Sequence, residues 1–211
     1  MNKIFLIYLL LISLISSCQT TKSLPTHEKE FYAQKTKSQI FVDENNNQLP
    51  YRLFLPDNYT PEREYPLILS FHGAGERGND NLKQLEPWVA GWIDGNVQKE
   101  NPCIFLMPQC PEGMQWVNVP WGDGSYSILD IPMSEPIRLA KKIFDKIIKE
   151  YSVDKNRIYV MGASMGGYAT WNFILNYPDI VAAAVPVCGA GDPSMSNRIK
   201  SIPVWAFHGE R

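Results

Sequence analysis

The sequence has almost no excess of charge of either sign, because its 211 residues include 20 basic and 22 acidic side chains. The formal net charge of -2 gives no reason to expect nucleic acid or another strongly charged partner. We find no internal repeat, and a hydrophobic content of 45% is enough for one substantial core. We therefore expect one globular domain whose ligand is recognised by local chemistry.

Cysteine is scarce as well, with four in the chain. Apart from Cys18 near the N-terminus, Cys103, Cys110 and Cys188 allow at most one disulfide. Cys103 and Cys110 flank an apolar run that, as a strand, would hold them roughly 23 Å apart, so only a pair of Cys110 with Cys188 stays open. No CxxC motif or Cys/His cluster suggests a metal, and we expect no cofactor.

The longest apolar run near the N-terminus is too short for a permanent membrane span, which needs about 20 residues. It covers residues 4–15 behind Lys3 and predicts a signal peptide over residues 1–17. Export of the protein is the expected consequence.

The signal ends in Ile-Ser-Ser-Cys at residues 15–18, which resembles the bacterial lipoprotein box. In that box the cysteine is acylated, so Cys18 would be a lipid anchor and residues 18–38 a tether without secondary structure. The alternative is ordinary cleavage that leaves a free cysteine. We expect a lipoprotein in the periplasm or at the cell surface.

The strand pattern indicates a mostly parallel sheet. Residues 39–43 and 51–55, separated by a polar turn, predict an antiparallel hairpin. Unbroken apolar runs follow at 67–71, 103–107, 157–161, 180–187 and 202–207. Such runs are typical of parallel strands that helices cover on both faces.

Two helices are predicted between these strands. Residues 134–151 repeat apolar side chains at helical spacing, with Ser134 as the N-cap and Pro136 in the first turn. A second helix is expected over residues 165–176, before Pro178. The alternation predicts one open, doubly wound α/β domain over residues 39–211.

A GxSxG motif at residues 162–166 lies between the strand at 157–161 and the second helix. The motif alone is weak, but a strand-to-helix turn places its serine in a strained conformation that requires small neighbours. Ser164 is therefore the candidate nucleophile, and the N–H of Met165 a candidate oxyanion donor. The alternative is a glycine-rich turn without a catalytic role.

A second motif, His-Gly-Ala-Gly at residues 72–75, follows the strand at 67–71. In α/β-hydrolases the loop at this place supplies the second oxyanion N–H, which we assign to Ala74. His72 is interpreted as structural, because the general base of that fold comes late in the chain. Glu76 and Arg77 either pair with each other or brace this loop.

Four segments of the chain carry a further signal: SFHGAGERGNDN at 70–81, MPQCP at 107–111, VDKNRIYVMGASMGG at 153–167 and PVWAFHG at 203–209. Together they resemble a family of exported α/β-hydrolases, described as predicted peptidases, polyhydroxybutyrate-depolymerase-like esterases or feruloyl-esterase-like carbohydrate esterases. The resemblance extends over residues 39–211. It implies an α/β-hydrolase fold and ester hydrolysis by a Ser, Asp and His triad.

The C-terminus departs from the family pattern. The family's aspartate would fall immediately beyond Arg211 and its histidine later still, whereas the histidines present are His27, His72 and His208. We therefore expect a C-terminally truncated hydrolase domain and almost no turnover from these 211 residues. Substitutes left open are His208 as base and Asp192 or Glu210 as acid.

Trp121 lies in a long segment that should cross the top of the sheet near the nucleophile. It could stack an aromatic acyl group or a sugar ring, or simply pack. The favoured function is a serine carboxylic ester hydrolase outside the cytoplasm, acting by analogy on feruloyl or acetyl esters of polysaccharides. The alternatives are a serine peptidase of the same fold and a catalytically inactive, glycan-binding surface lipoprotein.

Overall fold

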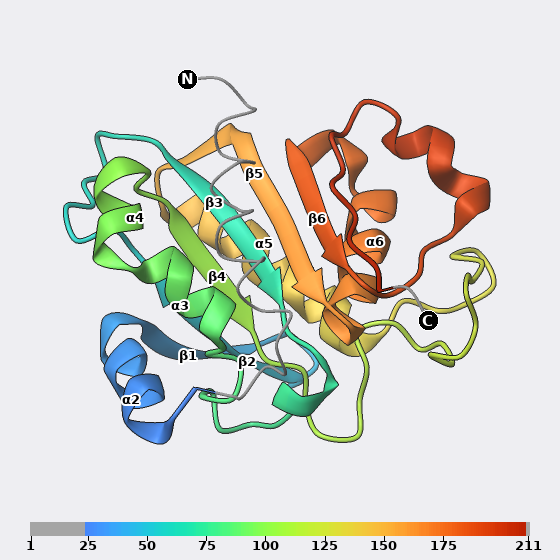
Figure 1. The fold of residues 1–211 in the computed structure, drawn as a ribbon, viewed down its shortest axis with the longest axis horizontal. Helices are drawn as coiled ribbons and strands as arrows, with labels where there is room; N and C mark the ends of the chain where they lie inside the picture. The colour runs from blue at the N-terminus through green and yellow to red at the C-terminus, as the bar shows by residue number, and fades with distance from the viewer. Residues whose placement is uncertain (1–23, 210–211) are drawn as a thin grey trace.

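The computed structural model describes residues 24–209, in which six strands form one twisted sheet (Figure 1). The strands lie in the order β1-β2-β4-β3-β5-β6. Their bounds are β1 Lys37–Val42, β2 Gln48–Phe54, β3 Tyr65–Phe71, β4 Ile104–Pro108, β5 Val153–Ala163 and β6 Ala183–Val187. β1 pairs antiparallel with β2 and β2 with β4, whereas the remaining pairs are parallel. The predicted mostly parallel sheet with an N-terminal hairpin is confirmed.

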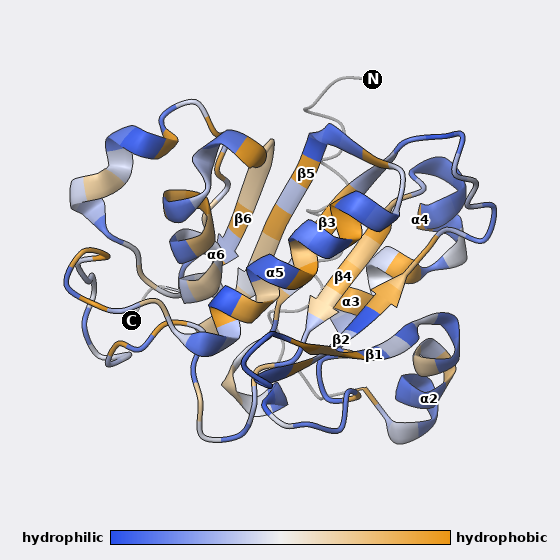
Figure 2. Cartoon of the chain, turned by 180° about the vertical axis from the view of Figure 1, so that it is seen from behind, coloured by the Kyte–Doolittle hydropathy of each residue, from blue (hydrophilic) through white to orange (hydrophobic). Residues whose placement is uncertain are grey.

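Helices cover both faces of this sheet, with α3 and α4 on one side and α5 and α6 on the other (Figures 1 and 2). The α-helices are α2 Thr26–Lys35, α3 Pro87–Ile93, α4 Gly95–Glu100, α5 Glu135–Glu150 and α6 Met165–Asn176. Three 3-10 helices are η1 Ala74–Glu76, η2 Pro178–Ile180 and η3 Pro193–Ile199. The arrangement is that of a doubly wound α/β protein.

Two hydrophobic cores follow from the alternation of side chains along each strand. On β3, Leu67 and Leu69 pack into the core under α5 and α6, whereas Ile68 packs into the core under α3. Every residue of β3 and β4 is buried, as expected for strands covered on both faces.

The predicted helix α5 shows how its sequence determines its position. Ser134 caps it by accepting a hydrogen bond from the N–H of Ile137 (3.4 Å). Its apolar side faces the sheet and its charged side faces solvent (Figure 2). The buried residues recur three or four apart and include Ile137, Ala140, Phe144 and Ile147.

The expectation that the tether has no secondary structure is wrong for residues 26–35, which form α2. None of the residues of this helix is buried, so the sequence has no apolar periodicity that would predict it. Partly buried Tyr32 and Ala33 pack against a hydrophobic core, and polar contacts add to this: Arg52 donates to the carbonyl of Ala33 (3.0 Å), and Lys29 pairs with Glu86 (3.0 Å).

Other boundaries also differ from the prediction. The strand expected at 180–187 begins at Ala183, because Pro178–Ile180 forms η2. The strand expected at 202–207 is reduced to two isolated parallel bridges, Ala184 to Val204 and Val187 to Phe207. Short helices α3 and α4 were not predicted, because seven and six residues are too few to display a helical period.

The predicted signal peptide and the lipid anchor Cys18 lie outside the described residues. Between residues 24 and 209, no helix has the length and apolar character needed to cross a bilayer. Cys103, Cys110 and Cys188 are free thiols, so the pair left open between Cys110 and Cys188 does not form in this structure.

Candidate active site

Ser164 stands at the turn where β5 ends and α6 begins. Its backbone has φ 56° and ψ -118°, a strained conformation for a residue with a side chain. The turn is fixed by a hydrogen bond from the Ser164 N–H to the carbonyl of Val187 at the end of β6 (2.8 Å). Ser164 is exposed, whereas Met165 after it is buried.

Two glycines make this turn sterically feasible. A Cβ at Gly162 would lie 2.3 Å from the carbonyl oxygen of Gly166. A Cβ at Gly166 would lie 2.0 Å from the carbonyl oxygen of Phe71. The need for small neighbours of the serine, inferred from the motif, is therefore a real packing constraint.

The loop after β3 lies against the same turn. Phe71 at the end of β3 pairs in register with Gly162 on β5, which brings the two strand ends together. A Cβ at Gly73 would be 3.7 Å from the Cβ of Ser164. Ala74 follows in η1, and Met165 opens α6, where the first N–H groups of a helix have no carbonyl of their own helix to bind. Both candidate oxyanion donors thus adjoin Ser164.

Ser164 borders a cavity of about 290 Å³. Trp121, Tyr168, Cys188 and His208 also line it, together with glycines of the loops. Trp121 is 47% exposed, and its carbonyl accepts a hydrogen bond from the hydroxyl of Tyr168 (3.1 Å). Trp121 therefore lies in a loop beside Ser164, as predicted.

The sequence reasoning did not select Tyr168 or Cys188. Tyr168 lies four residues after Ser164, and so one helical turn along the same face of α6. Cys188 follows the last residue of β6, at the strand edge where the nucleophile turn also lies. Helical spacing from Ser164 could have indicated Tyr168, and the end of a parallel strand could have indicated Cys188.

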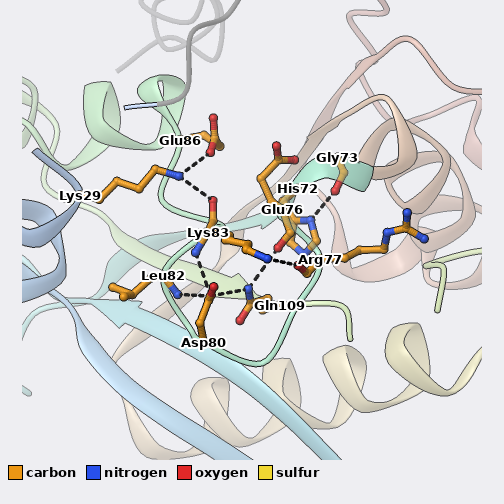
Figure 3. Close-up of polar contacts among 10 residues, drawn as sticks. All are labelled: Lys29, His72, Gly73, Glu76, Arg77, Asp80, Leu82, Lys83, Glu86 and Gln109. Atoms are coloured by element: carbon orange, nitrogen blue, oxygen red, sulfur yellow. Dashed lines mark hydrogen bonds and ion pairs between the residues drawn. The ribbon is translucent and has the colours of Figure 1, made fainter. Parts of the chain in front are cut away.

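His72 is buried and has both ring nitrogens in use. Figure 3 shows its contact with Gly73. Its Nε2 accepts from the N–H of Cys110 (2.8 Å), so its Nδ1 carries the proton and donates to the carbonyl of Gly73 (2.6 Å). Burial lowers the pKa of His72 to about 4. A neutral histidine bonded in this way supports the loop and is unsuited to be a general base.

The residues that the sequence left open as a substitute base or acid, His208, Asp192 and Glu210, do not lie together. His208 lines the cavity of Ser164, whereas Asp192 lines a neighbouring apolar pocket with Trp171. Asp192 caps η3 by accepting from Ser194 N–H (2.9 Å), and also accepts from Ile128 N–H (2.8 Å). The carboxylate therefore serves the local fold. Glu210 lies outside the described residues.

The sheet order, the strained serine turn and the adjoining loop define an α/β-hydrolase. A model of the prolyl oligopeptidase family matches residues 140–210. A solved thermostable esterase superposes with a TM-score of 0.75 and is 41% identical, over 83% of this chain and 46% of its own. The similarity to esterases of this fold that the motifs indicated is confirmed.

Two further similarities are to a curated enzyme and to a solved esterase structure. A bifunctional acetylxylan esterase/xylanase of Neocallimastix patriciarum is 27% identical over 74% of this chain and 20% of its own length. A feruloyl esterase module from Clostridium thermocellum, 18% identical, superposes with a TM-score of 0.59 over 90% of this chain and 73% of its own. The chain thus spans less than half of the thermostable esterase and a fifth of the bifunctional enzyme.

Proposed function

We propose that the protein is a serine hydrolase that cleaves carboxylic esters. The observation that carries this proposal is the exposed Ser164 at positive φ, beside the loop of Ala74 and open to a cavity of about 290 Å³. The esterases among its relatives support the same class of reaction.

The proposed chemistry has two steps. The hydroxyl oxygen of Ser164 attacks the ester carbonyl carbon while a general base takes the hydroxyl proton. The N–H groups of Ala74 and Met165 stabilise the negative oxygen of the tetrahedral intermediate, which collapses as the base returns the proton to the leaving oxygen and the alcohol departs. Water then attacks the acyl-serine while the base takes a proton from it, and return of that proton to the serine oxygen releases the acid and restores the hydroxyl. Within residues 24–209, His208 is the histidine that lines the cavity, and it can be tested as the base.

The experiment uses protein produced from its complete natural gene. Ser164→Ala should lower kcat on 4-nitrophenyl acetate by about 10³-fold or more, and abolish labelling by a fluorophosphonate probe. The matched control is Ser201→Ala, which removes an exposed hydroxyl away from the cavity and should change neither result. Full activity in Ser164→Ala would refute the assignment, and His208→Ala tests the base in the same assay.

We propose feruloyl or acetyl esters of polysaccharides as the substrates. The names of the relatives support this class, and Trp121 offers a half-exposed aromatic wall beside Ser164. Trp121→Ala should raise KM for methyl ferulate about threefold to tenfold, because stacking is lost. KM for 4-nitrophenyl acetate, which carries no aromatic acyl group, should stay unchanged. Equal effects on both substrates would contradict stacking of the acyl group.

A peptidase is the second candidate, and the match of residues 140–210 to the prolyl oligopeptidase family favours it. The same serine and oxyanion donors would attack an amide. Hydrolysis of aminoacyl anilides faster than of either ester, by the same protein preparation, would select the peptidase.

We further propose export with a lipid anchor at Cys18. The basic and apolar segment before a lipoprotein-like box supports it. Cys18→Ala should move the protein from the membrane fraction to the soluble periplasmic or extracellular fraction, with loss of metabolic labelling by a fatty acid. Unchanged fractionation of Cys18→Ala would contradict the anchor.

A further inference from the structure

We propose that Glu76 and Arg77 are positioning residues that hold the peptide between Gly73 and Ala74, so that the Ala74 N–H faces the oxygen of a substrate carbonyl. The inference rests on the proposed function, because it concerns the oxyanion donor of the same reaction.

The polar groups around this peptide have specific partners. The carbonyl of Gly73 accepts from Nδ1 of His72 (2.6 Å), and the carbonyl of Ala74 accepts from Nε of Arg77 (2.9 Å). The Glu76 carboxylate lies against Gly73. Among residues 24–209, the N–H of Ala74 has no acceptor, so it is free to bind a ligand.

Glu76 acts at the start of η1, where Gly73 is the N-cap and Glu76 the third residue. A side chain at this position can reach back to the N-cap N–H, as the glutamate of a capping box does. One of its carboxylate oxygens lies 3.0 Å from the place of a Cβ at Gly73. The Glu76 side chain thereby fills the space beside Gly73, which directs a substrate oxygen to the next N–H along the chain, that of Ala74.

Arg77 holds the other side of the loop and reaches two further segments. Its Nη1 donates to the carbonyl of Met114 (3.4 Å), and its guanidinium carbon lies 5.8 Å from the ring centroid of Trp121. One planar side chain thus connects the oxyanion loop with the wall of the cavity. Lysine could not reproduce this arrangement, because it lacks the fixed fork of donors.

The two side chains do not form an ion pair with each other. They leave the loop in different directions, Glu76 on one side and Arg77 on the other (Figure 3). Of the two alternatives that the sequence left open, bracing of the loop is the arrangement in the structure.

The test compares Glu76→Ala, Glu76→Gln, Arg77→Ala and Arg77→Lys in the protein from its complete gene, with exposed Arg198→Ala as the control. Arg77→Ala and Glu76→Ala should each lower kcat on 4-nitrophenyl acetate about tenfold to a hundredfold, since a misplaced oxyanion donor weakens transition-state binding. KM should stay close to its original value. Glu76→Gln should recover activity because its amide has the shape of the carboxylate and fills the same space beside Gly73, whereas Arg77→Lys should not.

A purely structural role would lower melting temperature and activity together, so both are measured. Added guanidinium ion should restore part of the kcat of Arg77→Ala and none of that of Ser164→Ala.

Melting temperatures equal to that of Arg198→Ala, together with the expected loss of kcat, support positioning. Arg77→Ala and Glu76→Ala with full kcat would overturn it, while the unaltered protein still hydrolyses esters and labels at Ser164. If the unaltered protein does neither, the proposed function itself fails and the inference with it.

Discussion

Glycines fix the position of Ser164 as firmly as any side chain does. A Cβ at Gly167 would lie 2.3 Å from the carbonyl oxygen of Cys188, and one at Gly166 would lie 2.0 Å from that of Phe71. The first turn of α6 therefore touches the ends of β3 and β6 through backbone alone. Any side chain there would push Ser164 away from the loop that follows β3.

Gly166→Ala should destabilise the protein by roughly 1 to 3 kcal/mol, because the added methyl group overlaps a backbone carbonyl that cannot rotate away. The measurement is urea unfolding monitored by tryptophan fluorescence. Gly95→Ala is the matched control, since nothing lies within 4 Å of its Cβ position. A Gly166→Ala variant as stable as Gly95→Ala would contradict the packing described for this turn.

His72 should make stability depend on pH. Burial lowers its folded pKa from 6.5 to about 4, so between these values the unfolded chain binds a proton that the folded chain does not. Stability should therefore fall as pH falls through this window, by at most about 1.4 kcal/mol per pH unit from this group. Urea unfolding at several pH values measures it.

The control for this prediction is His72→Gln, which removes the titrating ring. Its stability should depend less steeply on pH between 6.5 and 4 than that of the unaltered protein. Parallel pH curves for the two proteins would show that His72 is already protonated or is not buried.

The sequence was most informative about residues that stand in a short motif directly after an apolar strand. Ser164 and Ala74 were selected because they follow apolar strands in recognisable motifs, and the structure brings them together. Bracing of the loop by Arg77 was one of two alternatives between which the sequence could not decide, because the acceptors of Arg77 lie on Ala74 and on the distant Met114. Bonds between a side chain and a remote carbonyl leave no periodic signal in the sequence.

At the level of elements, strong periodicity decided which predictions succeeded. The bounds of α5 and α6 were predicted closely. α5 places a continuous apolar face on the sheet, and α6 is buried almost throughout. α2 was missed because it buries no residue. Residues 202–207 look like a strand in sequence, yet only Val204 and Phe207 form bridges to β6.

Ser134→Ala should destabilise the protein by about 1 to 2 kcal/mol. The Ser134 hydroxyl accepts from Ile137 N–H (3.4 Å) and donates to the carbonyl of Trp116 (2.5 Å), so its loss removes an N-cap and a tertiary bond. Thermal unfolding measures the change. Exposed Ser201→Ala is the control and should be neutral, and an equally neutral Ser134→Ala would contradict the cap.

Across the whole molecule, Arg52 connects elements that are distant in sequence. From β2 it donates to the carbonyl of Ala33 at α2 (3.0 Å), to Oγ1 of Thr36 (2.8 Å) and to the carbonyl of Asn81 in the segment after β3. Asn81 N–H in turn donates to Gln109, whose amide donates to the carbonyl of Glu76 (3.1 Å). The N-terminal helix, the hairpin and the oxyanion loop thus share one buried polar network.

Arg52→Ala should therefore destabilise the protein by about 3 kcal/mol or more, because several buried acceptors lose their donor at once. Hydrogen exchange should accelerate in α2 and around Asn81, far more than in α6. Exposed Arg198→Ala is the control and should leave exchange unchanged. Exchange that accelerates equally everywhere would show that Arg52 supports global stability and not this connection.

The two halves of the cavity differ in how they are held. Backbone contacts at Gly162, Gly166 and Gly167 lock the serine to three strand ends, whereas Trp121 sits in a segment outside any helix or strand, attached there by Tyr168. Mutations in that segment can therefore accumulate and reshape one wall of the cavity while the hydroxyl of Ser164 stays where it is. If the proposed ester hydrolysis holds, selection for a new substrate would act on that wall, and the serine turn would be inherited intact.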